Sequence, residues 1–310
     1  MTPTYEGRTL PKPDEELVDQ GLQFDIATLM GRRGLLALAG GLGAATLAAC
    51  ASATSSPAPS TAASTTAAST GSGATSATSA PAATITEVPD ETAGPYPGDG
   101  SNGPDVLEQS GIVRNDIRSS FGTSTATAAG IQLTFTLKVI DMAKGNVPFS
   151  GAAVYAWHCD QQGRYSMYSS GITQENYLRG VQVADASGSV TFTSVFPGCY
   201  DGRWPHIHFE VYPDQASITD AKNAIATSQL ALPKDACDAV YATSGYSASV
   251  SNLSRITLAT DNVFGDDGGR SQLATMSGST SAGFQAMLNV GVDTRTTPTA
   301  GNAPGRPGSR

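Results

Sequence analysis

The most constraining feature of this sequence is an alternating stretch at residues 199–211, CYDGRWPHIHFEV. From residue 206 onward, apolar residues alternate with polar ones, which is the pattern of a β-strand with one buried face. His206 and His208 therefore leave the same face of this strand, two residues apart. The turn signal Asp201-Gly202 predicts that the chain folds back before the strand and brings Tyr200 beside the two imidazoles.

Two other interpretations of this pair of histidines stay open. A His-x-His strand can carry two hydrogen-bonded polar residues on a solvated sheet face. A zinc site would need a third ligand such as His, Cys or a carboxylate, and nothing in the sequence places His158, the remaining histidine, near the other two. The alternative function is thus a secreted β-sandwich module that binds aromatic or plant-polymer ligands without catalysis.

A second glycine-flanked turn supplies another tyrosine. The turn DQQGRYS at residues 160–166 contains Tyr165, and it is followed by YLRGVQ at 177–182 and FPGCYDGRWPHIHF at 196–209. This ordered set, within about residues 91–233, resembles the intradiol ring-cleavage dioxygenases, which hold non-haem ferric iron with two tyrosines and two histidines. By position, the resemblance implies that the iron ligands are Tyr165, Tyr200, His206 and His208.

This ligand set is chemically consistent with one ferric ion. Phenolate is a hard, anionic oxygen donor, so two phenolates offset much of a trivalent charge and favour ferric over ferrous iron. An unperturbed tyrosine has a pKa of ~10, and only a strongly polarising cation would hold two of them ionised at neutral pH. The expected cofactor is therefore one non-haem Fe(3+).

The resemblance also implies a reaction, the intradiol cleavage of a catechol-type aromatic diol by O2 to a cis,cis-muconate-type diacid. The diol displaces the second tyrosine of the family, here Tyr200, which takes a substrate proton as it leaves. Tyr165 and the two histidines stay bound throughout. Catechol, protocatechuate, hydroxyquinol and lignin-derived relatives all remain open as substrates, because pocket shape decides between them. The oligomeric state is open as well.

Further positions match family residues around the substrate. Pro95 and Tyr96 match a segment that packs over the substrate ring, and Arg114 matches a loop near the pocket mouth. Arg203 matches an arginine that stabilises the negative charge developing on the ring. A buried guanidinium there would be costly unless an anion arrives to pair with it. Two more residues are expected nearby: Gln229 as a catalytic residue, and Trp204 either as a pocket wall or as a cap on the sandwich edge.

The first 49 residues resemble an export signal. Arg32-Arg33 precede a short apolar, glycine-rich run, as in a twin-arginine signal, and that run is too short for a good membrane span. The sequence LAAC ending at Cys50 resembles a lipobox, in which Cys50 is lipidated and becomes the first mature residue; an ordinary signal peptidase site is the alternative. The protein is therefore expected to be exported, and either lipid-anchored through Cys50 or extracellular.

The rest of the chain divides into three parts. Residues 50–84 are rich in Ser, Thr, Ala and Pro and carry no charge, which predicts a flexible tether. Residues 85–293 are enough for one catalytic domain with a core, and the tail 294–310 is expected to be disordered. The formal net charge is −9 and no basic stripe is present, so nucleic acid is not an expected partner.

The domain is predicted to be mainly β, an antiparallel β-sandwich with long loops and little helix. One helix is expected at residues 220–232. Strands are expected at residues 131–141, 152–158, 189–195, 205–212, 255–259 and 285–292.

Three cysteines follow Cys50. They are Cys159, Cys199 and Cys237. Outside the cytoplasm one disulfide and one leftover thiol are expected, with the pairing open. Cys199 is expected to fix the turn that carries Tyr200 rather than to bind the metal.

Overall fold

The computed structural model describes residues 4–5, 8–9 and 85–299. Two short strands near the N-terminus, β1 (Thr4–Tyr5) and β2 (Arg8–Thr9), pair with each other. The rest of the predicted export signal, including Arg32-Arg33, and the whole tether with Cys50 lie outside the described residues, so those assignments stay predictions. In the described part of the chain, no helix has the length and apolar character needed to cross a membrane.

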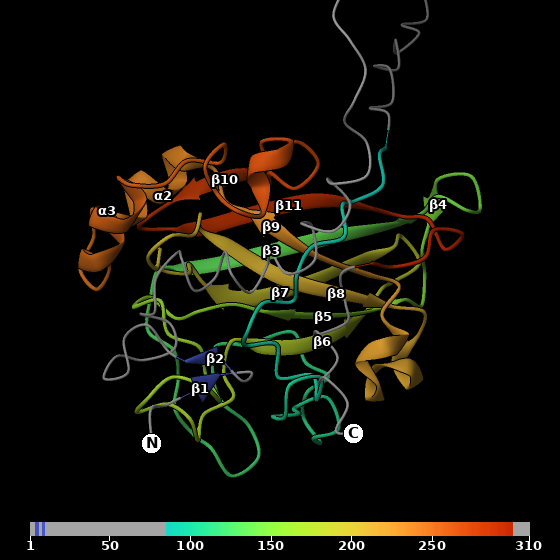
Figure 1. Cartoon of the computed structure of the whole chain (residues 1–310), viewed down its shortest axis with the longest axis horizontal. Helices are drawn as coiled ribbons and strands as arrows, with labels where there is room; N and C mark the ends of the chain where they lie inside the picture. Colours follow the sequence, from blue (N-terminus) through green and yellow to red (C-terminus); the bar gives the residue numbers. More distant parts are fainter. Residues whose placement is uncertain (1–3, 6–7, 10–84, 300–310) are drawn as a thin grey trace, which may run out of the picture. The chain divides into compact units, whose positions relative to one another are not determined.

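Two β-sheets lie over one another in residues 85–299 (Figure 1). The first sheet contains β10 (Thr275–Ser279), β11 (Gly283–Val292), β3 (Gln132–Asp141), β4 (Val147–Pro148) and β7 (Ser189–Val195). The second contains β6 (Arg179–Val183), β5 (Ala153–Trp157), β8 (His206–Tyr212) and β9 (Ala226–Ala231). All pairs are antiparallel except β3 with β11, which run parallel. The mainly β prediction is thus confirmed, with one parallel pair added.

The second sheet is buried on both faces. Towards the first sheet, β8 contributes Ile207, Phe209 and Val211 to the main hydrophobic core. Loops cover the opposite face, where Tyr155 and Trp157 of β5 belong to a second apolar cluster. Every residue of β8 is consequently buried, including its polar ones. Buried polar groups are unfavourable unless they find partners, so the histidine face of β8 is where a functional site is expected.

The predicted helix at residues 220–232 is wrong. This segment forms a single 3-10 turn, Ala221–Asn223, and then strand β9. The strand forms because residues 226–231 pair with β8 and provide hydrogen-bond partners for the backbone N–H and C=O groups at its edge. The helices come later, as α2 (Lys234–Tyr241), which follows Pro233, and α3 (Ser247–Leu253). Two further 3-10 turns are η2 (Gln215–Thr219) and η4 (Phe264–Asp266).

The predicted strand at residues 255–259 is also wrong. The chain turns there, with the Arg255 N–H donating to Asn252 O, and Ile256 is the one buried side chain of this segment. Five of the six predicted strands are confirmed as β3, β5, β7, β8 and β11. The sequence did not predict β4, β6, β9 and β10. These strands are short or polar, and they form by pairing with neighbouring strands.

The expected disulfide is wrong as well. Cys159, Cys199 and Cys237 are all buried free thiols. Helix α3, not a disulfide, holds the chain before Tyr200, since the Cys199 N–H donates to Ser249 Oγ and Asn252 Nδ2 donates to Cys199 O. The start of the predicted disordered tail, residues 294–299, is described and bonds to Glu87 and Asp90; residues 300–310 lie outside the described part.

Candidate active site

The structure brings all four predicted ligands together on the outer face of the second sheet. His206 Nε2 lies 3.1 Å from His208 Nε2 and 3.2 Å from the Tyr200 hydroxyl. The Tyr165 ring lies edge-on to Tyr200 and to His208, with ring centroids 5.9 and 6.2 Å apart. Two phenols and two imidazoles thus converge on one point, as the sequence predicted.

The histidine nitrogens that face this point are suited to bind a metal. The Nδ1–H of His206 donates to Trp204 O. Because a carbonyl only accepts, the proton of the neutral ring sits on Nδ1 and leaves the Nε2 lone pair free. Such outer partners fix the tautomer and orientation of metal-binding histidines. Burial lowers the pKa of His206 to about 3, and the nearby Arg203 charge acts in the same direction. His206 is therefore neutral at physiological pH.

Two buried polar atoms of the predicted ligands have no hydrogen-bond partner among the described residues. The Tyr165 hydroxyl makes no hydrogen bond of normal geometry although it is buried, and neither does His208 Nδ1. Burial, followed by the proximity of Tyr200, holds the pKa of Tyr165 well above its usual range. Burial and the His206 and Arg203 neighbours hold the pKa of His208 well below its usual range. A polarising cation at this point would ionise the Tyr165 phenol and accept the Nε2 lone pairs of the two neutral imidazoles, so the donor set fits a ferric ion.

Buried loops fix Tyr165 in place. We call residues 160–178 the Tyr165 loop. Its backbone is tied by Tyr165 N–H to Ser169 Oγ and by Ser166 Oγ–H to Tyr177 O. The fully buried Arg179 guanidinium donates five hydrogen bonds, to Ser166 O and Oγ, Tyr96 O, Pro97 O and the Tyr155 hydroxyl. Sequence reasoning missed Arg179, although it stands inside the family-like YLRGVQ motif.

The Tyr200 side chain is less buried than that of Tyr165. We call residues 196–203 the Tyr200 turn. The Tyr200 side chain is half-buried, and the neighbouring Asp201 is exposed in an ion pair with Arg255 at 2.7 Å. Gly163 permits the approach of the two tyrosine-bearing segments, because a Cβ on it would lie 3.0 Å from Tyr200 Cβ and its φ is +84°.

A segment from the N-terminal side of the domain lies over the ligands. Gly94 has a φ of +73°, and a Cβ on it would lie 3.3 Å from the His208 ring. The Tyr96 ring packs against Tyr165 with centroids 5.0 Å apart. Trp157 also stacks on His208, with ring centroids 4.9 Å apart and ring planes 8° from parallel. The His208 ring is thus close to both the Trp157 indole and the Gly94 backbone.

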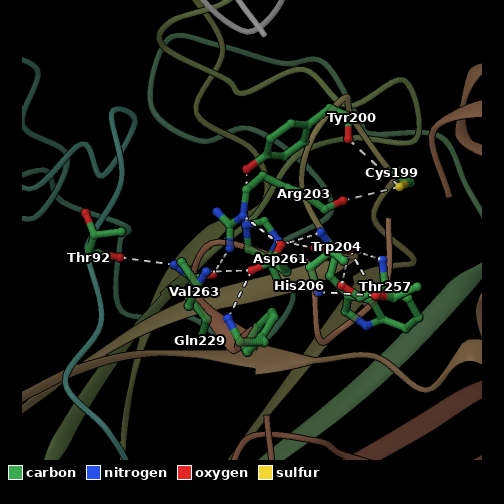
Figure 2. A network of polar contacts seen from close by, with 12 residues as sticks. Thr92, Cys199, Tyr200, Arg203, Trp204, His206, Gln229, Thr257, Asp261 and Val263 are labelled. Atoms are coloured by element: carbon green, nitrogen blue, oxygen red, sulfur yellow. Dashed lines mark hydrogen bonds and ion pairs between the residues drawn. The ribbon is translucent and has the colours of Figure 1, made fainter. Parts of the chain in front are cut away.

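Arg203 is already paired, which corrects the expectation that only an arriving anion would compensate its charge. Its Nε donates to Asp261 Oδ2 at 3.0 Å, and its Nη2 donates to Gln229 Oε1 at 2.6 Å (Figure 2). Burial disfavours the charged guanidinium, yet Asp261 raises the pKa of Arg203 above its usual value. Gln229 in turn donates to Thr92 O at 3.1 Å. Sequence reasoning placed Arg203 and Gln229 here but missed Asp261.

The three remaining predicted residues, Pro95, Trp204 and Arg114, each make hydrogen bonds with other parts of the domain. Pro95 adjoins Gly94 and Tyr96, and its carbonyl accepts from Asn102 Nδ2. Trp204 is buried in the main core, where its Nε1 donates to Leu232 O. The Arg114 guanidinium donates to the backbone oxygens of Ser119, Asn176 and Arg179, away from the four ligands.

The third histidine is not part of the site. His158 contacts Cys159 O through Nδ1 and Ser194 Oγ through Nε2. Among the residues that the structure describes, no three His, Cys, Asp or Glu side chains come together as a metal site. The donors that do converge are two histidines and two tyrosines.

Comparison with known proteins bears on this donor set. The family model described as Dioxygenase matches residues 102–220. The structure is similar to an intradiol ring-cleavage dioxygenase from Tetranychus urticae, with 25% identity, a TM-score of 0.55, and coverage of 68% of this chain and 97% of that one. The comparisons support the intradiol dioxygenase family.

A sequence relative agrees with the intradiol dioxygenase family over a shorter stretch. Chlorocatechol 1,2-dioxygenase from Rhodococcus opacus is 33% identical over 76 residues. This stretch is 24% of the present chain and 29% of the relative. The sequence match thus covers well under a third of either protein, whereas the similarity of fold spans most of the described domain.

Proposed function

We propose that this chain is a non-haem Fe(III) intradiol dioxygenase, which cleaves a catechol-type diol with O2 to a cis,cis-muconate-type diacid. The convergence of Tyr165, Tyr200, His206 and His208 carries the proposal. Two hard phenolates with two neutral imidazoles select ferric iron over zinc. The similarity to intradiol dioxygenases supports the same reaction class.

The four side chains would hold one ferric ion. When bound, the ion would supply a Lewis acid that draws electron density from the ring of the bound diol and makes the ring reactive towards O2. Tyr165, His206 and His208 would remain as ligands, because all three are buried and fixed by neighbouring groups. Tyr200 differs from them, since its side chain is half-buried on a turn.

Tyr200 is the residue that would exchange with substrate. Its oxygen lies beside His206 Nε2, so a diol that takes its place meets the same ligand set. As a phenolate leaving the metal, Tyr200 would accept a proton from a diol hydroxyl. Tyr200 would thus serve as the base, and the place that its hydroxyl leaves beside His206 would receive a substrate oxygen.

Other residues would orient the substrate ring. Gly94, Pro95 and Tyr96 lie over the ligands and would limit how the ring enters. Arg203 would stabilise negative charge on the ring as a fixed hydrogen-bond donor within its pair with Asp261, rather than as an uncompensated cation. Gln229 would hold the Arg203 guanidinium in this orientation, because its Oε1 accepts a hydrogen bond from Arg203 Nη2.

The experiment is to load the purified protein with ferric iron and record its visible spectrum. Tyrosinate bound to ferric iron gives a charge-transfer band, so the proposal expects a red-brown protein that loses its colour on chelation or reduction. A colourless protein with a full equivalent of iron would contradict the tyrosinate site. A protein that takes up no iron would favour a binding module.

We also propose that the protein is exported and anchored by a lipid on Cys50. The twin arginines, the LAAC sequence and the uncharged stretch that follows support this. Cys50→Ser is expected to move the protein from the membrane fraction to the soluble fraction with unchanged specific activity. If the Cys50→Ser variant still sediments with membranes, the proposal of a lipid anchor on Cys50 is wrong.

A further inference from the structure

We propose that Asp261 is a positioning residue of this site, whose carboxylate sets the placement of Arg203, of the Trp204 peptide and, through that peptide, of the His206 imidazole. The inference rests on the proposed function, because it concerns how the same site is held in working geometry. Asp261 lies outside the matched residues 102–220.

Asp261 accepts four hydrogen bonds from two segments of chain, 203–204 and 263–264. Its Oδ2 accepts from Arg203 Nε at 3.0 Å and from the Trp204 N–H at 2.7 Å. Its Oδ1 accepts from the N–H groups of Val263 and Phe264 at 2.8 and 3.0 Å. The residue as a whole is only 2% exposed. Both oxygens are therefore used, and all four partners are donors.

One arm of this arrangement reaches a predicted metal ligand. The Trp204 peptide lies between the two groups, since its N–H bonds to Asp261 and its carbonyl accepts from His206 Nδ1 (Figure 2). Phe264, whose N–H also bonds to Asp261, packs edge-on to the His206 ring at 6.4 Å. A shift of Asp261 would move both the hydrogen-bond partner and the packing partner of the His206 ring.

The other arm reaches the segment over the site. Asp261 orients Arg203, Arg203 bonds to Gln229 Oε1, and Gln229 Nε2 donates to Thr92 O. Thr92 Oγ1 accepts from the Gly94 N–H at 3.0 Å, and Gly94 faces His208. The chain of contacts thus connects Asp261 with the backbone above the second histidine.

Only a carboxylate can accept all four bonds. Asparagine has nearly the same shape, but its NH2 group would meet either Arg203 Nε or the N–H groups of Val263 and Phe264, which are donors as well. It would also leave the Arg203 charge buried without its counter-ion. Burial opposes ionisation of Asp261, but the Arg203 charge and the N–H donors outweigh it and lower the pKa of Asp261.

The test compares Asp261→Asn with Asp238→Asn, which removes an exposed ion pair to Lys234 on α2. In the metal-free proteins, hydrogen–deuterium exchange is expected to rise for Asp261→Asn at residues 91–96 and 200–208, while β3 and β11 keep wild-type exchange. Asp238→Asn should match the wild type throughout. Unchanged exchange at 91–96 and 200–208 would overturn the proposal, and so would a uniform rise over the domain, which indicates a merely structural role.

The iron-loaded proteins provide a second readout. Asp261→Asn is expected to lower kcat by about 100-fold, the effect of misplacing a reacting group by about 1 Å, with little change in KM. If Asp261→Asn does not fold, Asp261→Glu keeps the charge but moves the carboxylate, and it should show the same local exchange and the same loss of kcat. Wild-type exchange and kcat in that variant would overturn positioning. An inactive wild-type enzyme would refute the proposed function, whereas the exchange data would still decide the role of Asp261.

Discussion

The Tyr165 loop and the Tyr200 turn present the same chemical group to one point but hold it in different ways. Tyr165 is buried, and the clamp by Arg179 fixes the backbone that follows it. Tyr200 is half-buried, and one neighbour on its turn, Asp201, forms an ion pair that is open to solvent. Arg179 is a buried cation that donates five hydrogen bonds. An exposed ion pair such as Asp201–Arg255, by contrast, adds only about 0–1 kcal/mol to the free energy of unfolding.

This difference assigns the two tyrosines different parts in the proposed reaction. A ligand that persists through turnover needs an immobile backbone, and a ligand that substrate displaces needs room to leave. The first description fits Tyr165, and the partly exposed Tyr200 side chain fits the second. The following variants test that division, beginning with the largest expected effect.

Tyr165→Phe is expected to remove function most completely. The change deletes a fixed donor, so iron affinity should fall by more than the roughly 10- to 100-fold typical of lost outer partners. Turnover should be lost with the iron. Metal analysis after dialysis and the intensity of the visible band measure both. A variant that keeps its iron and its turnover would show that Tyr165 is not a ligand.

Tyr200→Phe is expected to separate binding from turnover. Three ligands remain, so the variant should retain iron and still change its spectrum when catechol is added. Turnover should fall by about 100- to 10,000-fold, because the departing base is absent. Stopped-flow spectra with catechol follow the binding step. If this variant lost iron as readily as Tyr165→Phe, the two tyrosines would be equivalent and the division would be wrong.

Acid should weaken the metal-free domain through its buried histidines rather than its tyrosines. Burial lowers the pKa of His158 to about 4 and that of His206 to about 3, below the ~6.5 expected when unfolded. The unfolded chain therefore binds more protons between pH ~6.5 and ~4, so stability is complete above ~6.5 and decreases as the pH falls. Urea unfolding at several pH values measures this, and each histidine should contribute up to about 1.4 kcal/mol per pH unit. A pH-independent unfolding energy across this range would contradict it.

Asp201→Asn should have the smallest effect. It breaks the exposed pair with Arg255 on the Tyr200 turn, and the expected loss of stability is at most about 1 kcal/mol. Iron content and the spectrum should stay as in the wild type. A large loss of turnover would mean that the exposed pair, rather than α3 and the buried bonds, holds the turn.

Local sequence patterns were enough to predict that the four candidate ligands lie together, but not which residues support them. The alternation in β8 is a local pattern, and it placed His206 and His208 on one face correctly. Tyr165 and Tyr200 came from turn motifs that also act over a few residues. Arg179 and Asp261 were missed because the contacts that decide their roles join distant parts of the chain, such as Arg179 with Tyr96 and Asp261 with Arg203.

The errors in secondary structure have a similar origin. Residues 226–231 were predicted to be helical, but pairing with β8 makes them a strand. Residues 255–259 look like a strand by composition, yet they follow α3 in a turn, in which the Arg255 and Ile256 N–H groups donate to Asn252 O and Leu253 O. The disulfide expectation followed from the predicted compartment, whereas the three cysteines are buried free thiols.

Oxygen consumption by the iron-loaded protein tests the central claim most directly. With an oxygen electrode and a panel of catechols, the account predicts that dioxygen and diol disappear in equal amounts and that the product is a muconate-type diacid, identified by mass. Chelation of the iron should abolish uptake, and Tyr200→Phe should slow it. Full iron occupancy with no uptake on any catechol, or a product cleaved outside the two hydroxyl-bearing carbons, would contradict the account.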